Sequence, residues 1–226
     1  MLRYCVIFFT IIWIAASCKM SNKNVKKHLL AEDPLPKDIL EIYLTKASLG
    51  NIEKGVDSFE VRKWYPFYYT DSFPVALERF YYHNGKFQGE YYLFSNKEGR
   101  ILMTKKELLG LQVEKYVIND IPSKFLDSLQ FNYNLANIDS FDINLVRNES
   151  ISRMSTRTNR NVFFEQSSST DYYGVFITEP GLYPALHPSL DMYASFSKFT
   201  FDSLCQRDTG FNKWFDEKAR RIEGLK

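Results

Sequence analysis

Two acidic residues, three histidines and one cysteine are the side chains of this chain with the clearest potential for chemistry. Glu165 lies on one expected strand and Asp171 at the start of the next, so their carboxylates could face each other. Such a pair can hydrolyse a glycoside. However, a chain with 27 Asp and Glu residues will contain facing acidic pairs by chance, so this pair does not predict catalysis by itself.

The histidines and the cysteine give no stronger signal. His28, His83 and His187 are far apart, and none has a second histidine or cysteine at the spacing of metal ligands. The sequence has no G-x-S-x-G elbow, no P-loop and no G-x-G-x-x-G. Cys205 is expected to be a small buried hydrophobe rather than a nucleophile. We therefore predict no catalytic residue, metal or cofactor, and leave open whether distant acids or histidines converge.

Tyrosine doublets are the main candidates for a binding surface. Neighbouring residues on a strand point to opposite faces, so each doublet places one ring inward and one outward. The outward rings would form an aromatic platform for a protein, peptide or sugar. The alternatives are that helices cover both faces of the sheet, or that the outward rings only shield it. The tyrosines concerned are Tyr81, Tyr82, Tyr91, Tyr92, Tyr172 and Tyr173.

A basic segment is a second candidate surface. Residues 148–160 are polar and contain Arg153, Arg157 and Arg160, which could contact phosphate or an anionic glycan. A solvated loop is the alternative interpretation. The net charge of the whole chain is only +2, which gives no electrostatic argument for nucleic-acid binding.

The N-terminal residues indicate where the protein is held. Arg3 precedes an apolar run, 4–16, that is shorter than the roughly 20 residues a membrane-spanning helix needs. Small residues and then Cys18 follow. The sequence Ile-Ala-Ala-Ser-Cys at 14–18 resembles the lipobox of bacterial lipoproteins. The alternatives are an ordinary secretory signal with an incidental cysteine, and a membrane-spanning helix.

The resemblance to the lipobox implies that residues 1–17 are a cleaved signal peptide and that Cys18 is lipidated. Two or three acyl chains would anchor the protein stably to a membrane. Lys19 follows where an aspartate usually marks retention in the inner membrane of this family, so the resemblance favours the outer membrane. Since Cys5 would leave with the signal, Cys205 would have no partner for an internal disulfide.

The remaining chain divides into a tether and one domain. Residues 18–36 are polar, basic and proline-terminated, which predicts a flexible tether whose lysines could contact anionic lipid. Residues 37–226 contain no long break rich in Pro, Gly and Ser and are expected to form one globular domain. The lysines concerned are Lys19, Lys23, Lys26 and Lys27.

Hydrophobic patterning predicts an α+β fold, an antiparallel sheet built from hairpins with several helices packed against it. Asn84-Gly85 predicts a two-residue hairpin turn whose opposing residue numbers sum to 169, which pairs Arg79 with Glu90 and Phe80 with Gly89. Further strands are expected at 58–70, 100–104, 141–147, 161–166 and 172–178. Helices are expected at 36–49, 105–111, from 121 and at 189–205, with a proline-rich loop at 179–188. In the first helix, one face carries Leu40, Tyr43, Leu44 and Ala47. The chain ends in an expected amphipathic helix built on Phe211, Trp214, Phe215 and Ile222.

The layout of lipobox, short tether and one aromatic-rich domain resembles the small lipoproteins of Gram-negative bacteria, a resemblance that implies no activity. The first hypothesis is a non-enzymatic binding or structural module of the cell envelope, anchored to the membrane through Cys18 and contacting an envelope protein or glycan. The second is an envelope glycan or peptide hydrolase. The third is an inhibitor or immunity-type protein that blocks a secreted toxin or enzyme.

Overall fold

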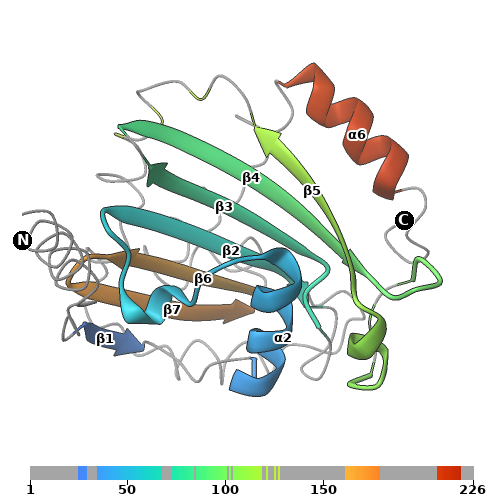
Figure 1. The fold of residues 1–226 in the computed structure, drawn as a ribbon, viewed down its shortest axis with the longest axis horizontal. Coiled ribbons are helices and arrows are strands. Elements are labelled where there is room, and N and C mark those ends of the chain that lie inside the picture. Colours follow the sequence, from blue (N-terminus) through green and yellow to red (C-terminus); the bar gives the residue numbers. More distant parts are fainter. Residues whose placement is uncertain are drawn as a thin grey trace, which may run out of the picture.

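The computed structural model describes residues 25–29, 35–67, 73–83, 85–100, 102, 104–118, 121, 125, 127, 161–178 and 208–219 (Figure 1). These residues form one open, mostly antiparallel sheet with helices on both faces, which confirms the predicted α+β class. The strands are β1 (Lys26–Leu29), β2 (Phe59–Phe67), β3 (Ala76–His83), β4 (Lys86–Ser95), β5 (Gln112–Ile118), β6 (Asn161–Ser168) and β7 (Asp171–Thr178). The helices are α2 (Lys37–Ala47), α6 (Thr209–Ala219) and the 3₁₀ turns η1 (Ile52–Lys54) and η2 (Glu107–Gly110).

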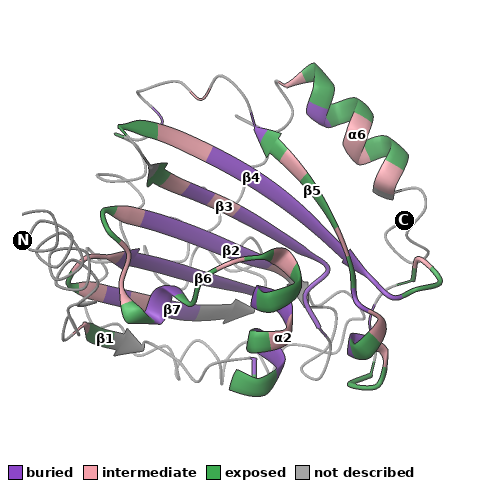
Figure 2. Ribbon diagram, viewed as in Figure 1, coloured by how far each residue is buried: buried purple, intermediate pink, exposed green. Residues whose placement is uncertain are grey.

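The order of strands across the sheet is β1-β7-β6-β2-β3-β4-β5. All neighbouring pairs are antiparallel except β1 and β7, which are parallel. Strand β2 lies at the centre because it pairs with β3 on one side and with β6, far along the chain, on the other. This central strand is also among the most buried parts of the sheet (Figure 2).

The β3–β4 hairpin has the predicted register. Gly85 has φ +73°, which is the left-handed conformation the predicted turn requires at this position. Arg79 is opposite Glu90 and Phe80 is opposite Gly89. The sequence-based register is therefore confirmed along the whole hairpin.

Gly89 is expected to be essential for packing in this hairpin. A Cβ atom there would lie 3.0 Å from Phe80 Cε1 and 2.8 Å from Ile121 Cδ1. We expect Gly89→Val to lower the free energy of unfolding by about 1–3 kcal/mol because the core is overpacked. Gly50→Val is the control, since nothing lies within 4 Å of a Cβ at Gly50. Urea unfolding measures both, and equal stabilities would contradict the prediction.

Helix α2 follows from an apolar stripe at helical spacing. Leu40, Tyr43 and Leu44 are buried as predicted, together with Ile39, whereas Ala47 is partly buried. The helix ends at Ser48, which has φ 57° and a left-handed conformation, and the Leu49 amide donates to Leu44 O at 2.8 Å. This is a common way to terminate a helix.

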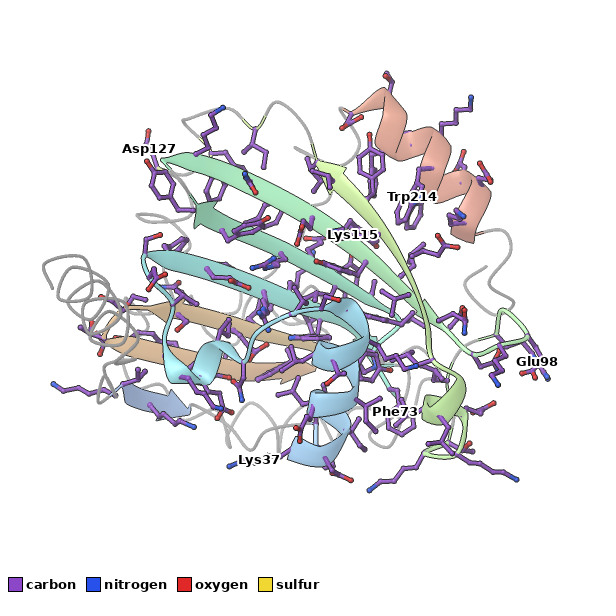
Figure 3. All side chains as sticks on the ribbon, in the orientation of Figure 1. Lys37, Phe73, Glu98, Lys115, Asp127 and Trp214 are labelled. Carbon is purple, nitrogen blue, oxygen red and sulfur yellow. The ribbon has the colours of Figure 1, made fainter. Side chains whose placement is uncertain are left out.

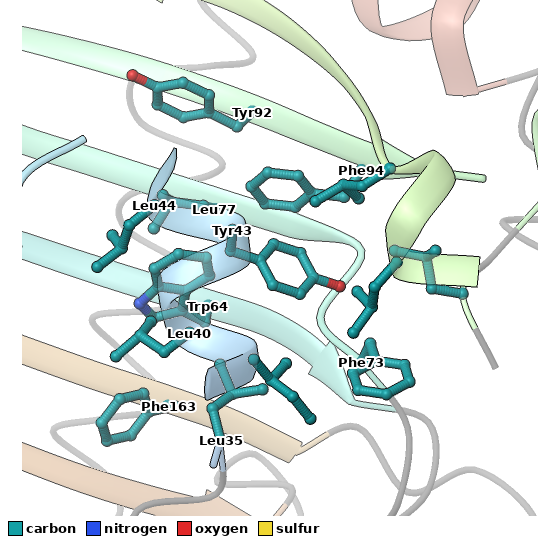
Figure 4. Packing of buried hydrophobic residues seen from close by; sticks show 14 residues of the cluster. Leu35, Leu40, Tyr43, Leu44, Trp64, Phe73, Leu77, Tyr92, Phe94 and Phe163 are labelled. Atoms are coloured by element: carbon teal, nitrogen blue, oxygen red, sulfur yellow. The ribbon is translucent and has the colours of Figure 1, made fainter. Parts of the chain in front are cut away.

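The main core lies between α2 and the sheet (Figure 4). Tyr43 packs edge-on against Phe94 and Trp64, with ring centroids at 4.8 and 5.9 Å, and its hydroxyl donates to Pro74 O at 3.0 Å. Burial raises the pKa of Tyr43 well above its ordinary value, so the hydroxyl stays protonated. We call the side of the sheet that carries these contacts the α2 face; it includes Trp64, Leu77, Tyr92, Phe94 and Phe163.

Helix α6 packs against the opposite side of the sheet, which we call the α6 face. Phe211, Trp214 and Phe215 surround Tyr91 with centroid distances of 5.0–6.0 Å. Trp214 points from the helix toward the sheet (Figure 3). The predicted amphipathic C-terminal helix is therefore confirmed over Thr209–Ala219.

Three parts of the sequence-based assignment are wrong. Lys26–Leu29 were assigned to the flexible tether but form β1, and Leu35 belongs to the core. Leu102 and Thr104 are not in a strand, although 100–104 was expected to be one. The true strand in this region, β5, was not predicted, and η2 covers only part of the expected helix 105–111.

Several predictions concern residues outside the described ranges. They include the signal peptide and Cys18, the strand 141–147, the basic segment 148–160, the proline-rich loop 179–188 and the helix 189–205. Of the helix expected from 121, Ile121 is described and is not helical, whereas Phe125 and Asp127 are. Within the described part of the chain, no helix combines the length and the apolar character needed to cross a membrane.

Candidate functional site

Four charged residues form a row across the α2 face. Glu165, Arg62, Arg79 and Glu90 are consecutive register partners on β6, β2, β3 and β4. We call them the charged row. On each of these strands, the residue two positions away is apolar and lies under α2. These apolar residues are Phe163, Trp64, Leu77 and Tyr92. The α2 face therefore changes from an apolar half to a charged half within two residues.

Arg79 is the centre of the charged row. Its Nε and Nη2 atoms donate to the two oxygens of Glu60 at 2.7 and 3.0 Å, and its Nη1 donates to Glu90 Oε2 at 2.8 Å. Its guanidinium also lies 3.8 Å from the ring centroid of Tyr81. Two carboxylates and one aromatic ring thus fix a single arginine, whose side chain is 17% exposed.

Arg62 is directly opposite Arg79, and Glu60 separates their charges. Glu60 Oε1 accepts from Arg62 Nε at 2.7 Å as well as from Arg79. Arg62 is almost fully buried, and its Nη2 donates to Gly50 O at 2.8 Å, which ties the loop after α2 to the sheet. Two like charges are tolerated side by side because one carboxylate bridges them.

The electrostatics of the cluster keep its carboxylates ionised. Burial raises the pKa of Glu60, but Arg62 and Arg79 outweigh this effect and hold the pKa below its ordinary value. For Glu90, burial is likewise outweighed by hydrogen bonds from Tyr92, Arg79 and Lys115, and its pKa is also lowered. Burial and the bond to Glu90 raise the pKa of Tyr92. The lowered pKa values keep Glu60 and Glu90 ionised near neutral pH.

The lowered carboxyl pKa values predict a loss of stability in acid. A carboxyl group with a folded-state pKa below its unfolded value stabilises the fold above the unfolded pKa, and this contribution is lost as the pH falls through the folded pKa. We expect the free energy of unfolding to decrease below about pH 4.5, and Glu90→Gln to weaken this dependence. Glu98→Gln, at an exposed carboxylate, is the control. Identical pH profiles for wild type and Glu90→Gln, measured by urea unfolding, would refute this account.

Beside the charged row, part of the α2 face reaches the surface. Tyr81 and Gln88 are opposite each other and partly exposed, and the Lys115 side chain is 47% exposed. Lys115 Nζ and the Tyr81 hydroxyl lie 3.1 and 3.4 Å from the same atom, Glu90 Oε1. Burial, followed by the nearby Glu90 charge, raises the pKa of Tyr81, which keeps its hydroxyl protonated. The surface thus combines an aromatic ring, an amide and a cation.

Glu165 and Asp171, whose carboxylates could have faced each other, point to opposite faces of the sheet. Glu165 is buried on the α2 face, where it accepts from Trp64 Nε1 at 2.5 Å and from the Tyr172 hydroxyl at 2.9 Å. Its register partner on β7 is Gly174. Asp171 directly precedes Tyr172 and therefore points to the α6 face. Strand alternation separates the two carboxylates, although they are close in sequence.

The tyrosine doublets point to both faces, as expected, but half of the proposed platform is buried. Tyr91 lies under α6, Tyr92 is 1% exposed beside the core, and Tyr172 is enclosed with Glu165. These three rings cannot contribute to a surface. The exposed or partly exposed members are Tyr81 on the α2 face and Tyr82 and Tyr173 on the α6 face.

The α6 face contains a second buried polar cluster. Lys63 Nζ forms an ion pair with Glu78 Oε2 at 2.8 Å and lies 4.3 Å from the ring centroid of Tyr65. The Tyr65 hydroxyl donates to Glu78 Oε1 at 2.6 Å and lies 2.8 Å from the Tyr91 hydroxyl. Lys63 and Glu78 are almost fully buried, so this cluster belongs to the interior and does not form a surface.

Other predicted site residues lie outside the part that the structure describes. They are Cys18, Arg153, Arg157, Arg160, His187 and Cys205. The side chains of His28 and His83 are also outside it. Among the described side chains, no group of three histidines, cysteines or acids could hold a metal ion.

Sequence reasoning found one contact of the charged row, between Arg79 and Glu90, because the hairpin turn fixed that register. It missed Glu60 and Arg62. Their spacing was the available signal. Glu60 and Arg62 are two positions apart on one strand, so their side chains share one face of the sheet. Comparison of the chain with protein-family models, with curated proteins and with solved structures finds no match.

Proposed function

We propose that this chain is a non-enzymatic binding module of a bacterial cell envelope, anchored through lipid on Cys18, more specifically in the outer membrane. Its ligand contacts the α2 face at Tyr81, Gln88 and Lys115. The lipobox pattern supports the anchor and the location. The stack of Arg79 on Tyr81, at 3.8 Å, is the observation that carries the binding surface.

This surface is preorganised for a ligand. Arg79 is fixed by Glu60 and Glu90, and the ring of Tyr81 lies against it. A side chain already held in place loses little conformational entropy when a ligand binds. Tyrosine and arginine are also the residue types that contribute most to binding energy at interfaces.

The chemistry of the surface fits an envelope glycan. A sugar ring can pack on the exposed part of Tyr81, while the amide of Gln88 and the ammonium of Lys115 can bind hydroxyl, acetamido or carboxylate groups. Peptidoglycan carries all three groups. The arrangement does not require the ligand to react, because the neighbouring carboxylates are held ionised by cations.

Co-sedimentation with isolated peptidoglycan sacculi tests this proposal. We expect Tyr81→Ala to weaken binding about tenfold or more, because an anchoring aromatic ring is lost. Tyr82→Ala is the matched control: Tyr82 is the next residue on β3, is 40% exposed and points to the opposite face. Equal binding by the two variants would contradict the proposed surface, and cleavage of the sacculi by the wild type would contradict a non-enzymatic role.

Mass spectrometry of the N-terminal peptide and membrane fractionation test the anchor. We expect acyl chains on Cys18 and loss of membrane association in Cys18→Ala. Cross-linked capture from intact cells with both forms then shows whether a protein is bound as well. An unmodified Cys18 would overturn the proposed anchoring and location.

A further inference from the structure

The N-terminal strand enters the sheet through a closely packed corner. The Lys26 amide donates to Thr170 O at 2.9 Å, and β1 continues parallel to β7. Val25, directly before β1, lies against Gly55, where a Cβ would be 2.9 Å from Val25 Cγ2. We call Val25, Gly55 and 168–170 the entry corner.

Gly55 shows how closely this corner is built. It has φ +84°, a conformation that residues with side chains rarely adopt, and a Cβ there would also lie 3.2 Å from Ser168 O. The next residue, Val56, donates its amide to Ser168 O at 3.0 Å. Two segments therefore contact the start of β1. Gly55, which follows η1, lies against Val25, and Thr170 in the β6–β7 turn accepts the Lys26 amide.

Only a short stretch of chain separates this corner from the lipidation site. Val25 is seven residues after Cys18, so the two can be at most about 25 Å apart even when the chain is fully extended. A flexible chain of this length has a mean span of about 15 Å. A tether running to residue 36, as the sequence suggested, would have had more than twice this fully extended length.

The geometry points to the β1 edge of the sheet, with the entry corner, as the surface that faces the lipid bilayer. This inference rests on the proposed function, because it requires lipid on Cys18. The sheet order places β5 six strands from β1, or roughly 29 Å at the usual strand spacing. Strand β5 and helix α6 lie on the side of the domain away from β1 (Figure 1). The candidate ligand surface at Tyr81 and Lys115 is thereby presented away from the membrane.

The restraint on this orientation comes from the length of the tether and not from the net charge of the entry corner. The exposed lysines near the corner are offset by nearby acids, and Lys27 forms an ion pair with Glu53. The groups concerned are Lys26, Lys27, Lys54, Glu53, Asp57 and Asp171. Because the charges balance, we expect the orientation to persist when the salt concentration is raised.

Position-specific fluorescence quenching tests the inference. The full-length lipidated protein, carrying Cys205→Ser, is reconstituted into phosphatidylethanolamine–phosphatidylglycerol vesicles containing metal-chelating lipids as a short-range quencher. A dye is attached at Thr170→Cys in the entry corner or at Val117→Cys in β5, where the native side chain is 49% exposed. We expect several-fold stronger quenching at position 170, in low and in high salt.

A lengthened tether is the matched control. Inserting about 30 Gly and Ser residues between Ser21 and Asn22 leaves the domain intact but releases its restraint, so quenching at the two positions should become similar and weak. Equal quenching at both positions with the native tether, on a chain whose Cys18 lipid is verified by mass spectrometry, would overturn the orientation alone. Absence of that lipid would overturn the proposed anchor and, with it, this inference.

Discussion

Arg79→Leu is expected to lower the free energy of unfolding by about 3–5 kcal/mol, the usual effect of breaking a buried ion pair from one side. Arg79 supplies three hydrogen bonds to two carboxylates, Glu60 and Glu90, and both are about 95% buried. Without the guanidinium, each carboxylate loses its main cationic contact to β3. Urea unfolding followed by circular dichroism measures the loss.

A double variant separates lost charge compensation from lost packing. Arg79→Leu combined with Glu90→Gln removes one cation and one anion. The double variant should therefore lose less free energy of unfolding than the sum of the losses in the two single variants. Arg79→Lys should show an intermediate effect, because an ammonium cannot bind Glu60 in a bidentate manner. If Arg79→Leu unfolds within about 0.5 kcal/mol of wild type, the cluster does not stabilise the fold in the way described.

Trp64→Ala is expected to lower the free energy of unfolding by about 3–5 kcal/mol through cavity formation. Trp64 is fully buried and packs against both Tyr43 of α2 and Phe94 of β4. The substitution also removes the Nε1 donor to Glu165 Oε2, at 2.5 Å, and leaves that buried carboxylate with one fewer partner.

Trp64→Phe distinguishes the two contributions. It keeps an aromatic ring in the core but removes the indole N–H, so we expect a smaller loss of about 1–3 kcal/mol. Calorimetry or urea unfolding gives both values. A phenylalanine variant as unstable as the alanine variant would show that the hydrogen bond, and not ring packing, dominates at this position.

Local signals in the sequence predicted the elements whose contacts are local. The Asn84-Gly85 pair fixed the β3–β4 hairpin to the correct register, because a two-residue turn leaves no freedom in pairing. The apolar stripe at Leu40, Tyr43 and Leu44 predicted α2, and Phe211 with Trp214 predicted α6.

The edges of the sheet were not predictable in the same way. Strand β1 has the sequence Lys-Lys-His-Leu, which carries no strand pattern, and it is held by β7 at a separation of about 145 residues. Strand β5 carries two adjacent charged residues, Glu114 and Lys115, which interrupt a regular polar–apolar alternation, and it was overlooked beside the expected helix. The expected strand 100–104 is wrong. The chain turns just before it, where Asn96 Oδ1 accepts the amides of Glu98 and Arg100, and it bends again at Thr104.

The candidate site was predictable only where one hairpin contains both partners. Arg79 and Glu90 met this condition. Arg62 and Glu165 meet only through β2–β6 pairing across about 100 residues, and no local pattern specifies that alignment. For the same reason, Glu165 and Asp171 looked adjacent in sequence but point to opposite sides of the sheet.

The boundary between the charged row and the apolar half of the α2 face also acts against misalignment. If β2 slipped by two residues relative to β6, every side chain would keep its face, but Arg62 would lie level with Phe163 instead of Glu165. Arg62 would keep its bond to Glu60, which lies on the same strand, but Trp64 would no longer lie within reach of Glu165, and a buried carboxylate would lose one of its donors. No short turn fixes the alignment of these two strands. The hydrogen bond from Trp64 to Glu165 therefore favours one alignment of two strands that are far apart in the sequence.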